Sequence, residues 1–85
     1  MVTQAKVYLL LEAVKGKRDN LAATIKGMAG VSAIDILDGR PDLLAVIEAP
    51  ERQEVAKHLM RLLDVMDGEV EDIRVFPVQK SADTI

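Results

Sequence analysis

The chain has 85 residues, which suits one small domain with a single core, and 49% of them are hydrophobic, with no Cys or Trp, one Tyr and one Phe. The absence of Cys excludes disulfides, thiolate metal sites and a Cys nucleophile. The formal net charge is −3 and the 11 Lys and Arg residues are scattered, so we expect no direct nucleic-acid binding, and the few aromatic residues disfavour base stacking.

The apolar runs are too short for a membrane protein. The longest of them is far below the roughly 20 residues that span a bilayer. No charged segment precedes a long apolar run at the N-terminus, so no signal peptide is recognised. We therefore expect a cytoplasmic protein without membrane contacts.

Residues 5–13 predict a strand, because this short segment is rich in residues that favour strands. Alternation places apolar side chains on both of its faces: Val7, Leu9 and Leu11 on one, Tyr8 and Leu10 on the other. A strand of an antiparallel sheet with one face in water would carry polar residues on that face. Both faces of this strand are therefore expected to be covered.

Residues 18–29 predict a helix with Asp19 in its first turn, where the helix dipole favours a negative charge, and with Gly30 as its C-terminal cap. Its apolar stripe consists of Leu21, Ala22, Ile25, Met28 and Ala29. Residues 31–37 then predict a strand, with Ser32, Ile34 and Ile36 on one face and Val31, Ala33, Asp35 and Leu37 on the other. Its polar residues favour an edge position.

The second half repeats this plan. Residues 43–48 predict a central strand that is again apolar on both sides, with Leu43, Ala45 and Ile47 against Leu44 and Val46. Residues 51–66 predict a helix, with Pro50 in its first turn and Glu51 and Glu54 complementing the dipole. Residues 70–78 predict a strand that either lies at an edge of the sheet or ends at Pro77, because Pro77 cannot donate to a ladder. The tail over residues 80–85 has no periodicity and is expected to be loose.

The order βαββαβ predicts an α+β, ferredoxin-like domain, with two helices on one face of a four-stranded antiparallel sheet. We expect one domain over residues 1–85, ordered over about residues 4–79. The helices can cover one face only, so a second copy of the sheet is the simplest cover for the other. We therefore predict a homodimer whose interface includes Tyr8, Leu10, Leu44 and Val46.

Little in the sequence points to catalysis or to a metal. His58 is the single histidine and falls at the border of a helix stripe, where a surface role is the usual one. Glu69, Glu71 and Asp72 are close in sequence, but strand alternation sends Glu71 and Asp72 to opposite faces. No Ser-His-Asp order or phosphate-binding glycine loop is found. We expect a protein that is not an enzyme and needs no metal or cofactor.

The turn over residues 38–44 is the candidate ligand site. As structure, Asp38 and Gly39 make a tight turn that Pro41 stiffens. As a site, the turn brings together Arg40, Asp42 and open backbone amides, which suit the carboxylate and ammonium groups of a small zwitterion. The candidate ligand-binding residues are Gly39, Arg40, Asp42 and Leu43. Both interpretations stay open at this point.

The run over residues 39–49, GRPDLLAVIEA, resembles the G-x-Y-D-L-L-hydrophobic-E-A segment of the effector-binding (RAM) domain of Lrp/AsnC transcription regulators. The preceding Met28-Ala29-Gly30-Val31 is similar to the L-P-G-V that ends that domain's first helix. The resemblance extends over residues 7–78 in the same element order. Two departures are Pro41, where the family usually has an aromatic residue, and Asp72 with Arg74, where it often has small hydroxyl residues.

The resemblance implies a dimeric α/β barrel that can assemble into rings and binds small effectors, such as amino acids, between subunits near Gly39 and Asp42. The family's N-terminal helix-turn-helix has no counterpart in this sequence. The resemblance therefore implies a stand-alone effector-binding and oligomerisation domain, with full-length Lrp/AsnC regulators as further candidate partners.

An alternative of another class is a chaperone. Proteins similar to the nitrate-reductase maturation factor NapD share the βαββαβ order and an apolar strand that ends in Glu-Ala, and they hold a signal peptide on the sheet. In that case the exposed sheet face would bind a peptide instead of a second copy.

Overall fold

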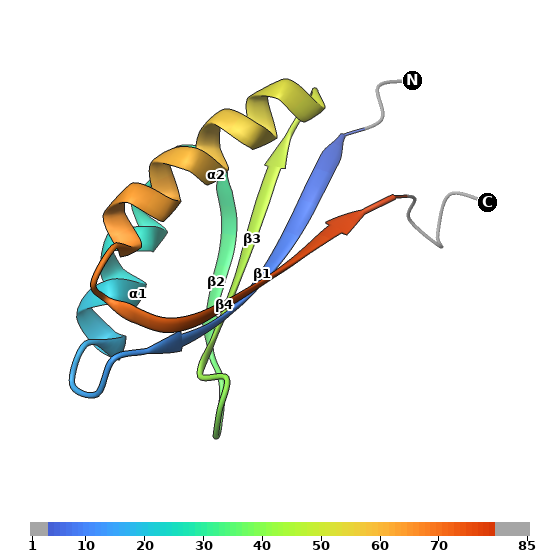
Figure 1. The fold of residues 1–85 in the computed structure, drawn as a ribbon. Helices are drawn as coiled ribbons and strands as arrows, with labels where there is room; N and C mark the ends of the chain where they lie inside the picture. Colours follow the sequence, from blue (N-terminus) through green and yellow to red (C-terminus); the bar gives the residue numbers. More distant parts are fainter. Residues whose placement is uncertain (1–3, 80–85) are drawn as a thin grey trace.

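The computed structural model describes residues 4–79, and the tail over residues 80–85 lies outside them. Six elements follow in the predicted order: β1 (Ala5–Ala13), α1 (Arg18–Lys26), β2 (Val31–Ile36), β3 (Leu43–Ala49), α2 (Arg52–Met66) and β4 (Val70–Val78). The strands form one antiparallel sheet in the order β2-β3-β1-β4. Both helices lie on one side of this sheet (Figure 1). The predicted ferredoxin-like α+β fold is confirmed.

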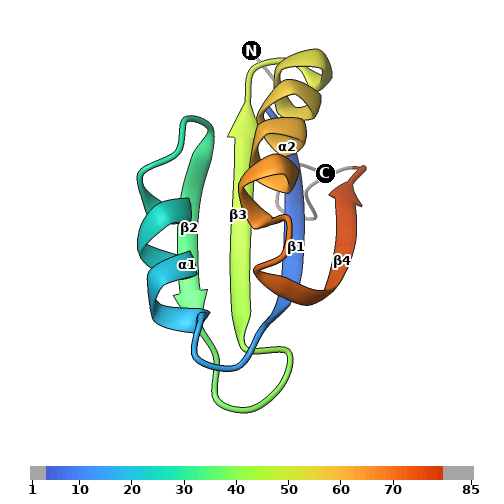
Figure 2. The same ribbon diagram turned by 60° about the vertical axis from the view of Figure 1, so that its left-hand side comes forward.

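The strands β2, β3 and β4 occupy the predicted positions in the sheet. The central pair is β1 and β3, which are the two strands with apolar residues on both faces, and β2 and β4 are the edges. Leu9 stands opposite Ala45, and Leu11 stands opposite Leu43. The two helices cover the side of the sheet that carries Leu9 and Leu11. Helix α1 lies mainly over β2, and α2 lies over β3 and β1 (Figure 2).

The core lies between the helices and the central strands. Its largest fully buried side chains are Leu9, Leu11, Ile25, Leu43, Ile47, Leu62 and Met66. All of them are aliphatic, as a composition poor in aromatic residues requires. The core therefore depends on the volume and shape of branched and flexible side chains.

The first helix is shorter than predicted. It ends at Lys26 with Gly27 as its C-cap, because a glycine costs helix stability and the chain turns there. Gly30 follows the helix in the turn to β2, with a φ of +85° that favours glycine. A Cβ at this position would collide with the ring of His58. Gly30 is thus required by backbone conformation and by packing, and the prediction that it caps the helix was wrong.

The second helix begins one residue later than predicted. It starts at Arg52, and Glu51 at the N-cap has an extended backbone with φ −129° and ψ 151°. Pro50 therefore precedes the cap instead of standing in the first turn. Glu54 does lie in the first turn, as predicted.

One face assignment in β2 was wrong. Val31 pairs with Ile47 and Ile34 pairs with Ala45, so both side chains lie on the helix side, although alternation assigned them to opposite faces. The register shifts between Val31 and Ala33. An irregularity of this kind inserts a residue into one strand and reverses the alternation before it.

Leu9→Ala is expected to lower the free energy of unfolding by about 2–5 kcal/mol, because it leaves a cavity in an enclosed aliphatic core. Met60→Ala is the matched control, since Met60 is 67% exposed on α2. Urea denaturation followed by circular dichroism measures both. Equal midpoints for the two variants would contradict the assigned core.

Candidate functional site

The side of the sheet that faces away from the helices carries an apolar area at its centre. Tyr8 stands opposite Val46 and Leu10 opposite Leu44 in the register of β1 and β3. On β4, Phe76 stands opposite Tyr8. Tyr8 is 37% exposed and Phe76 is 48% exposed. We call these five residues the open sheet face.

Charged residues of both signs lie beside the open sheet face. The Lys6 ammonium lies 4.0 Å from a carboxylate oxygen of Glu48 on the neighbouring strand. On β4, the Arg74 Nε lies 3.4 Å from a carboxylate oxygen of Asp72. An apolar centre with a mixed charged rim is the usual composition of a protein interface.

The turn between β2 and β3 is held by Asp42. Its side chain is buried, and its Oδ1 accepts a hydrogen bond of 2.9 Å from the Ala13 N–H. Its backbone N–H donates to the Leu11 carbonyl at 3.0 Å, and its carbonyl accepts from the Leu37 N–H at 2.8 Å. Asp42 therefore closes the turn and ties it to the end of β1.

Arg40 reaches from the same turn toward three carboxylates. Its Nε donates to Glu12 at 3.2 Å, its Nη2 donates to Glu71 at 3.2 Å, and its Nη1 lies 3.8 Å from the Asp42 Oδ2. Its Nη2 also lies 3.4 Å from the carbonyl of Ala13. The Arg40 side chain remains 47% exposed. We call Arg40, Glu12, Glu71 and Asp42 the Arg40 cluster, in which carboxylates outnumber cations.

The remaining predicted residues of the turn differ in accessibility. Gly39 has a φ of +101°, and the space around its α-carbon is open. The Arg40–Pro41 peptide bond is cis. The Leu43 side chain is fully buried in the core, so only its backbone belongs to the turn. The structure thus brings Gly39, Arg40 and Asp42 together, and ligand binding by these residues stays a prediction.

Sequence reasoning missed Glu12 and Glu71 as members of this cluster. They lie 28 and 31 residues from Arg40 in the sequence and come from β1 and β4. That the ends of these strands lie next to the turn can be inferred only when the order of the strands in the sheet is known. No local pattern around either glutamate indicates that contact.

The other candidates give no site of their own. His58 lies on α2 against Gly30, and its buried Nδ1 has no hydrogen-bond partner among residues 4–79. Within the same residues, no three His, Asp or Glu side chains are grouped as a metal site would need. Neither α1 nor α2 is long and apolar enough to cross a membrane.

No family model matches the sequence. No curated protein matches it either. Solved structures do match. A hypothetical protein from Pyrococcus horikoshii, PHS023, is 14% identical with a TM-score of 0.78, and the alignment covers 92% of this chain and 93% of that one.

Two larger structures match over about half their length. An AsnC family transcriptional regulator from Agrobacterium tumefaciens is 12% identical with a TM-score of 0.76, over 95% of this chain and 54% of the regulator. The transcriptional regulator NMB0573 from Neisseria meningitidis, described in complex with L-Met, is 18% identical with a TM-score of 0.71, over 92% and 51%.

These likenesses show a shared fold. The chain spans about half the length of the regulators and nearly all of the small Pyrococcus protein. The two larger neighbours are described as transcription regulators.

Asp42→Ala is expected to lower the free energy of unfolding by about 1–3 kcal/mol, because the Ala13 N–H would be left buried without its acceptor. Asp38→Ala in the same turn is the control, since Asp38 is exposed. Thermal denaturation of both variants measures the difference. Equal melting temperatures would show that the Asp42 contact does not stabilise the turn.

Proposed function

We propose that this chain is a ligand-binding and oligomerising domain of the Lrp/AsnC type, acting in the cytoplasm without catalysis. The observation that carries the proposal is the open sheet face, on the fold that solved AsnC family regulators share. The resemblance of residues 39–49 to the family's effector turn supports the same assignment. One matching structure is a protein of nearly the same extent as this chain, so the fold also occurs in that small form.

The open sheet face is proposed to bind a second copy. Fully burying a large apolar side chain contributes about 1.5–3 kcal/mol, so the exposed Tyr8 of β1 and Phe76 of β4 favour association. Leu10 and Leu44 are half-buried and Val46 is already buried within the single chain. Around them, Lys6 with Glu48 and Arg74 with Asp72 supply both charges. A two-fold axis can set each charge opposite its complement on the other copy. The same face could pair with full-length regulators of the family, and rings would be a further step of assembly.

The ligand is proposed to bind at the Arg40 cluster. The Arg40 guanidinium suits a carboxylate, and Glu12 and Glu71 suit an ammonium group. Exposed ion pairs contribute little, about 0–1 kcal/mol, so a ligand can replace them at small cost. Asp42 keeps its bond to Ala13 and holds the turn in place. The proposed effector is therefore a small amino acid or a similar zwitterion.

Leu10→Asp is expected to convert a homodimer into a monomer, because it places a charge at the centre of the apolar interface. Met60→Asp, on the exposed side of α2, should remain dimeric. Light scattering coupled to size-exclusion chromatography at micromolar concentration measures the mass. A monomeric wild-type protein would refute the proposed dimer.

An amino-acid panel tests the ligand. We expect at least one of the twenty amino acids to raise the melting temperature, since a ligand bound only to the folded state stabilises it. The variant Arg40→Gln should lose this rise in melting temperature. The variant Arg61→Gln, at an exposed position of α2, should retain it. A twin-arginine signal peptide is assayed in parallel. A shift with the peptide and with no amino acid would favour the chaperone alternative and contradict this proposal.

A further inference from the structure

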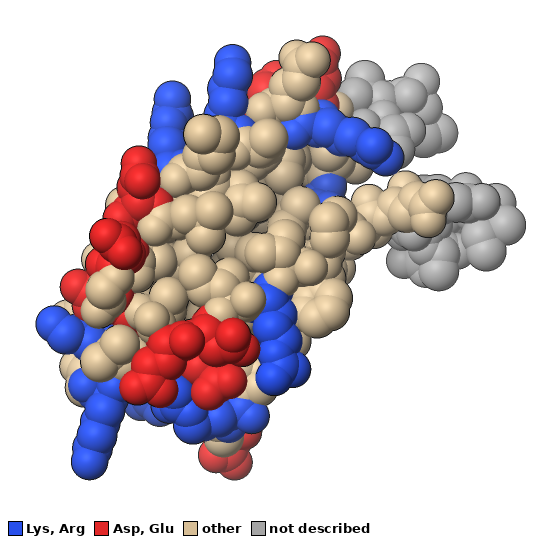
Figure 3. All heavy atoms as spheres, in the orientation of Figure 1, with Lys and Arg blue, Asp and Glu red and all other residues tan. Residues whose placement is uncertain are grey.

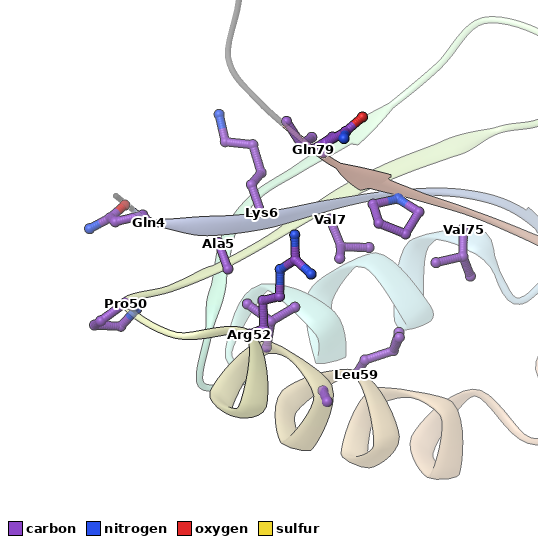
Figure 4. Close-up of a pocket in the computed structure, with 13 residues that line it drawn as sticks. Gln4, Ala5, Lys6, Val7, Pro50, Arg52, Leu59, Val75 and Gln79 are labelled. Atoms are coloured by element: carbon purple, nitrogen blue, oxygen red, sulfur yellow. The ribbon is translucent and has the colours of Figure 1, made fainter. Parts of the chain in front are cut away.

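A cleft lies on the helix side of the sheet, far from the turn between β2 and β3. It is a cleft of about 530 Å³ between the start of α2 and the outer ends of β1 and β4 (Figure 4). Its lining residues are Gln4, Ala5, Lys6, Val7, Pro50, Arg52, Val55, Ala56, Leu59, Val75, Pro77, Val78 and Gln79. The volume falls within the range of about 300–1,000 Å³ that is typical of small-molecule sites.

The cleft exists because two helices cannot cover four strands. α2 packs over β3 and β1, and β4 extends past it at the edge of the sheet (Figure 2). Val75 stands opposite Leu9 and therefore lies on the helix side, yet it is 42% exposed. In the space-filling view, side chains without charge occupy the area between α2 and β4 (Figure 3). An apolar wall is thus left open beside the core.

The charges of the cleft have one sign. Its lining contains Lys6 and Arg52 and no Asp or Glu, although the chain as a whole has a net charge of −3. Lys6 is paired with Glu48 and extends away from α2 (Figure 4). Arg52 extends from α2 toward β1, and no carboxylate lies within ion-pair distance of it among residues 4–79. A single guanidinium therefore faces an apolar cleft without a counter-ion.

We propose that the cleft binds a small amphipathic monocarboxylate, with its carboxylate on Arg52 and its hydrocarbon body against Val7, Val55, Leu59 and Val75. A guanidinium binds a carboxylate through two parallel hydrogen bonds, which gives the head group a fixed position. The apolar wall accepts a hydrocarbon chain. An ammonium group would find no acid in the lining, so a zwitterionic amino acid is disfavoured at this site.

This site differs from the Arg40 cluster in place and in chemistry. The Arg40 cluster lies where β1 ends and β3 begins, and the cleft lies where β1 begins and α2 follows β3. The open sheet face is on the opposite side of the sheet from the helices, so a dimer formed through it leaves the cleft accessible. The inference therefore goes beyond the proposed function and does not depend on it.

The test is a titration of the full chain with decanoate below its micelle concentration, with decylamine and decanol as matched probes. Calorimetry gives the affinities, and amide chemical shifts in NMR spectra give the location. We expect decanoate to bind at least about tenfold more tightly than decanol, because only its carboxylate can form a charged hydrogen bond with Arg52. Decylamine should not bind, and the shifts should centre on Val55, Leu59 and Val75.

Three variants separate the head group from the apolar body. Arg52→Gln should weaken decanoate at least about tenfold and leave decanol unchanged, and Arg52→Lys should recover part of the loss. Lys57→Gln removes a positive charge from the exposed side of the same helix and should have no effect. Ala56→Trp fills the cleft and should abolish binding of both decanoate and decanol.

Three results would overturn the inference: no binding of decanoate at millimolar concentration, equal losses in Arg52→Gln and Lys57→Gln, or shifts centred on residues 38–43 or on the open sheet face. The amino-acid panel and the mass measurement report on Arg40 and on the open sheet face. Failure of the proposed function and failure of this inference are therefore seen in different experiments.

Discussion

The structure depends on a mismatch between two strands that are apolar on both faces and two helices that can cover only one. β1 and β3 occupy the centre of the sheet, where Leu9, Leu11, Leu43 and Ile47 build the core with the helices. The same strands present Tyr8, Leu10, Leu44 and Val46 on the other side. A domain of this size has little stability to spare. The proposed association through the second face would bury these apolar side chains and so add to the stability of the fold.

The edge strand β4 is also left uncovered by the helices. α2 stabilises β3 and β1 and leaves the helix side of β4 open, which produces the cleft above Val75. The two uncovered surfaces differ in chemistry. The open sheet face has charges of both signs beside it, whereas the cleft carries one unpaired guanidinium. The two proposals therefore place a protein partner and a small molecule at separate positions on one small sheet.

The strands, their order along the chain and the central position of β3 could be predicted, because the alternation of apolar and polar residues indicates which faces are buried. The end of α1 and the irregularity at Val31 could not be predicted in this way. Both depend on where the chain turns and not on periodicity. At the turn, Gly39, Arg40 and Asp42 were found from their local sequence, but the partners of Arg40 come from distant strands. The cleft depends on the offset between α2 and β4, which no single segment encodes.

The contact between Gly30 and His58 determines how closely α2 packs against the turn before β2. The His58 imidazole occupies the space that a side chain at residue 30 would fill, so α2 packs closely against the backbone of Gly30. The Gly30 carbonyl also accepts a hydrogen bond of 2.9 Å from the Glu48 N–H, which ties the turn before β2 to β3. Any larger residue at position 30 would strain the backbone and require the His58 side chain to move. The close approach of α2 to the turn before β2 therefore requires a residue without a side chain at position 30.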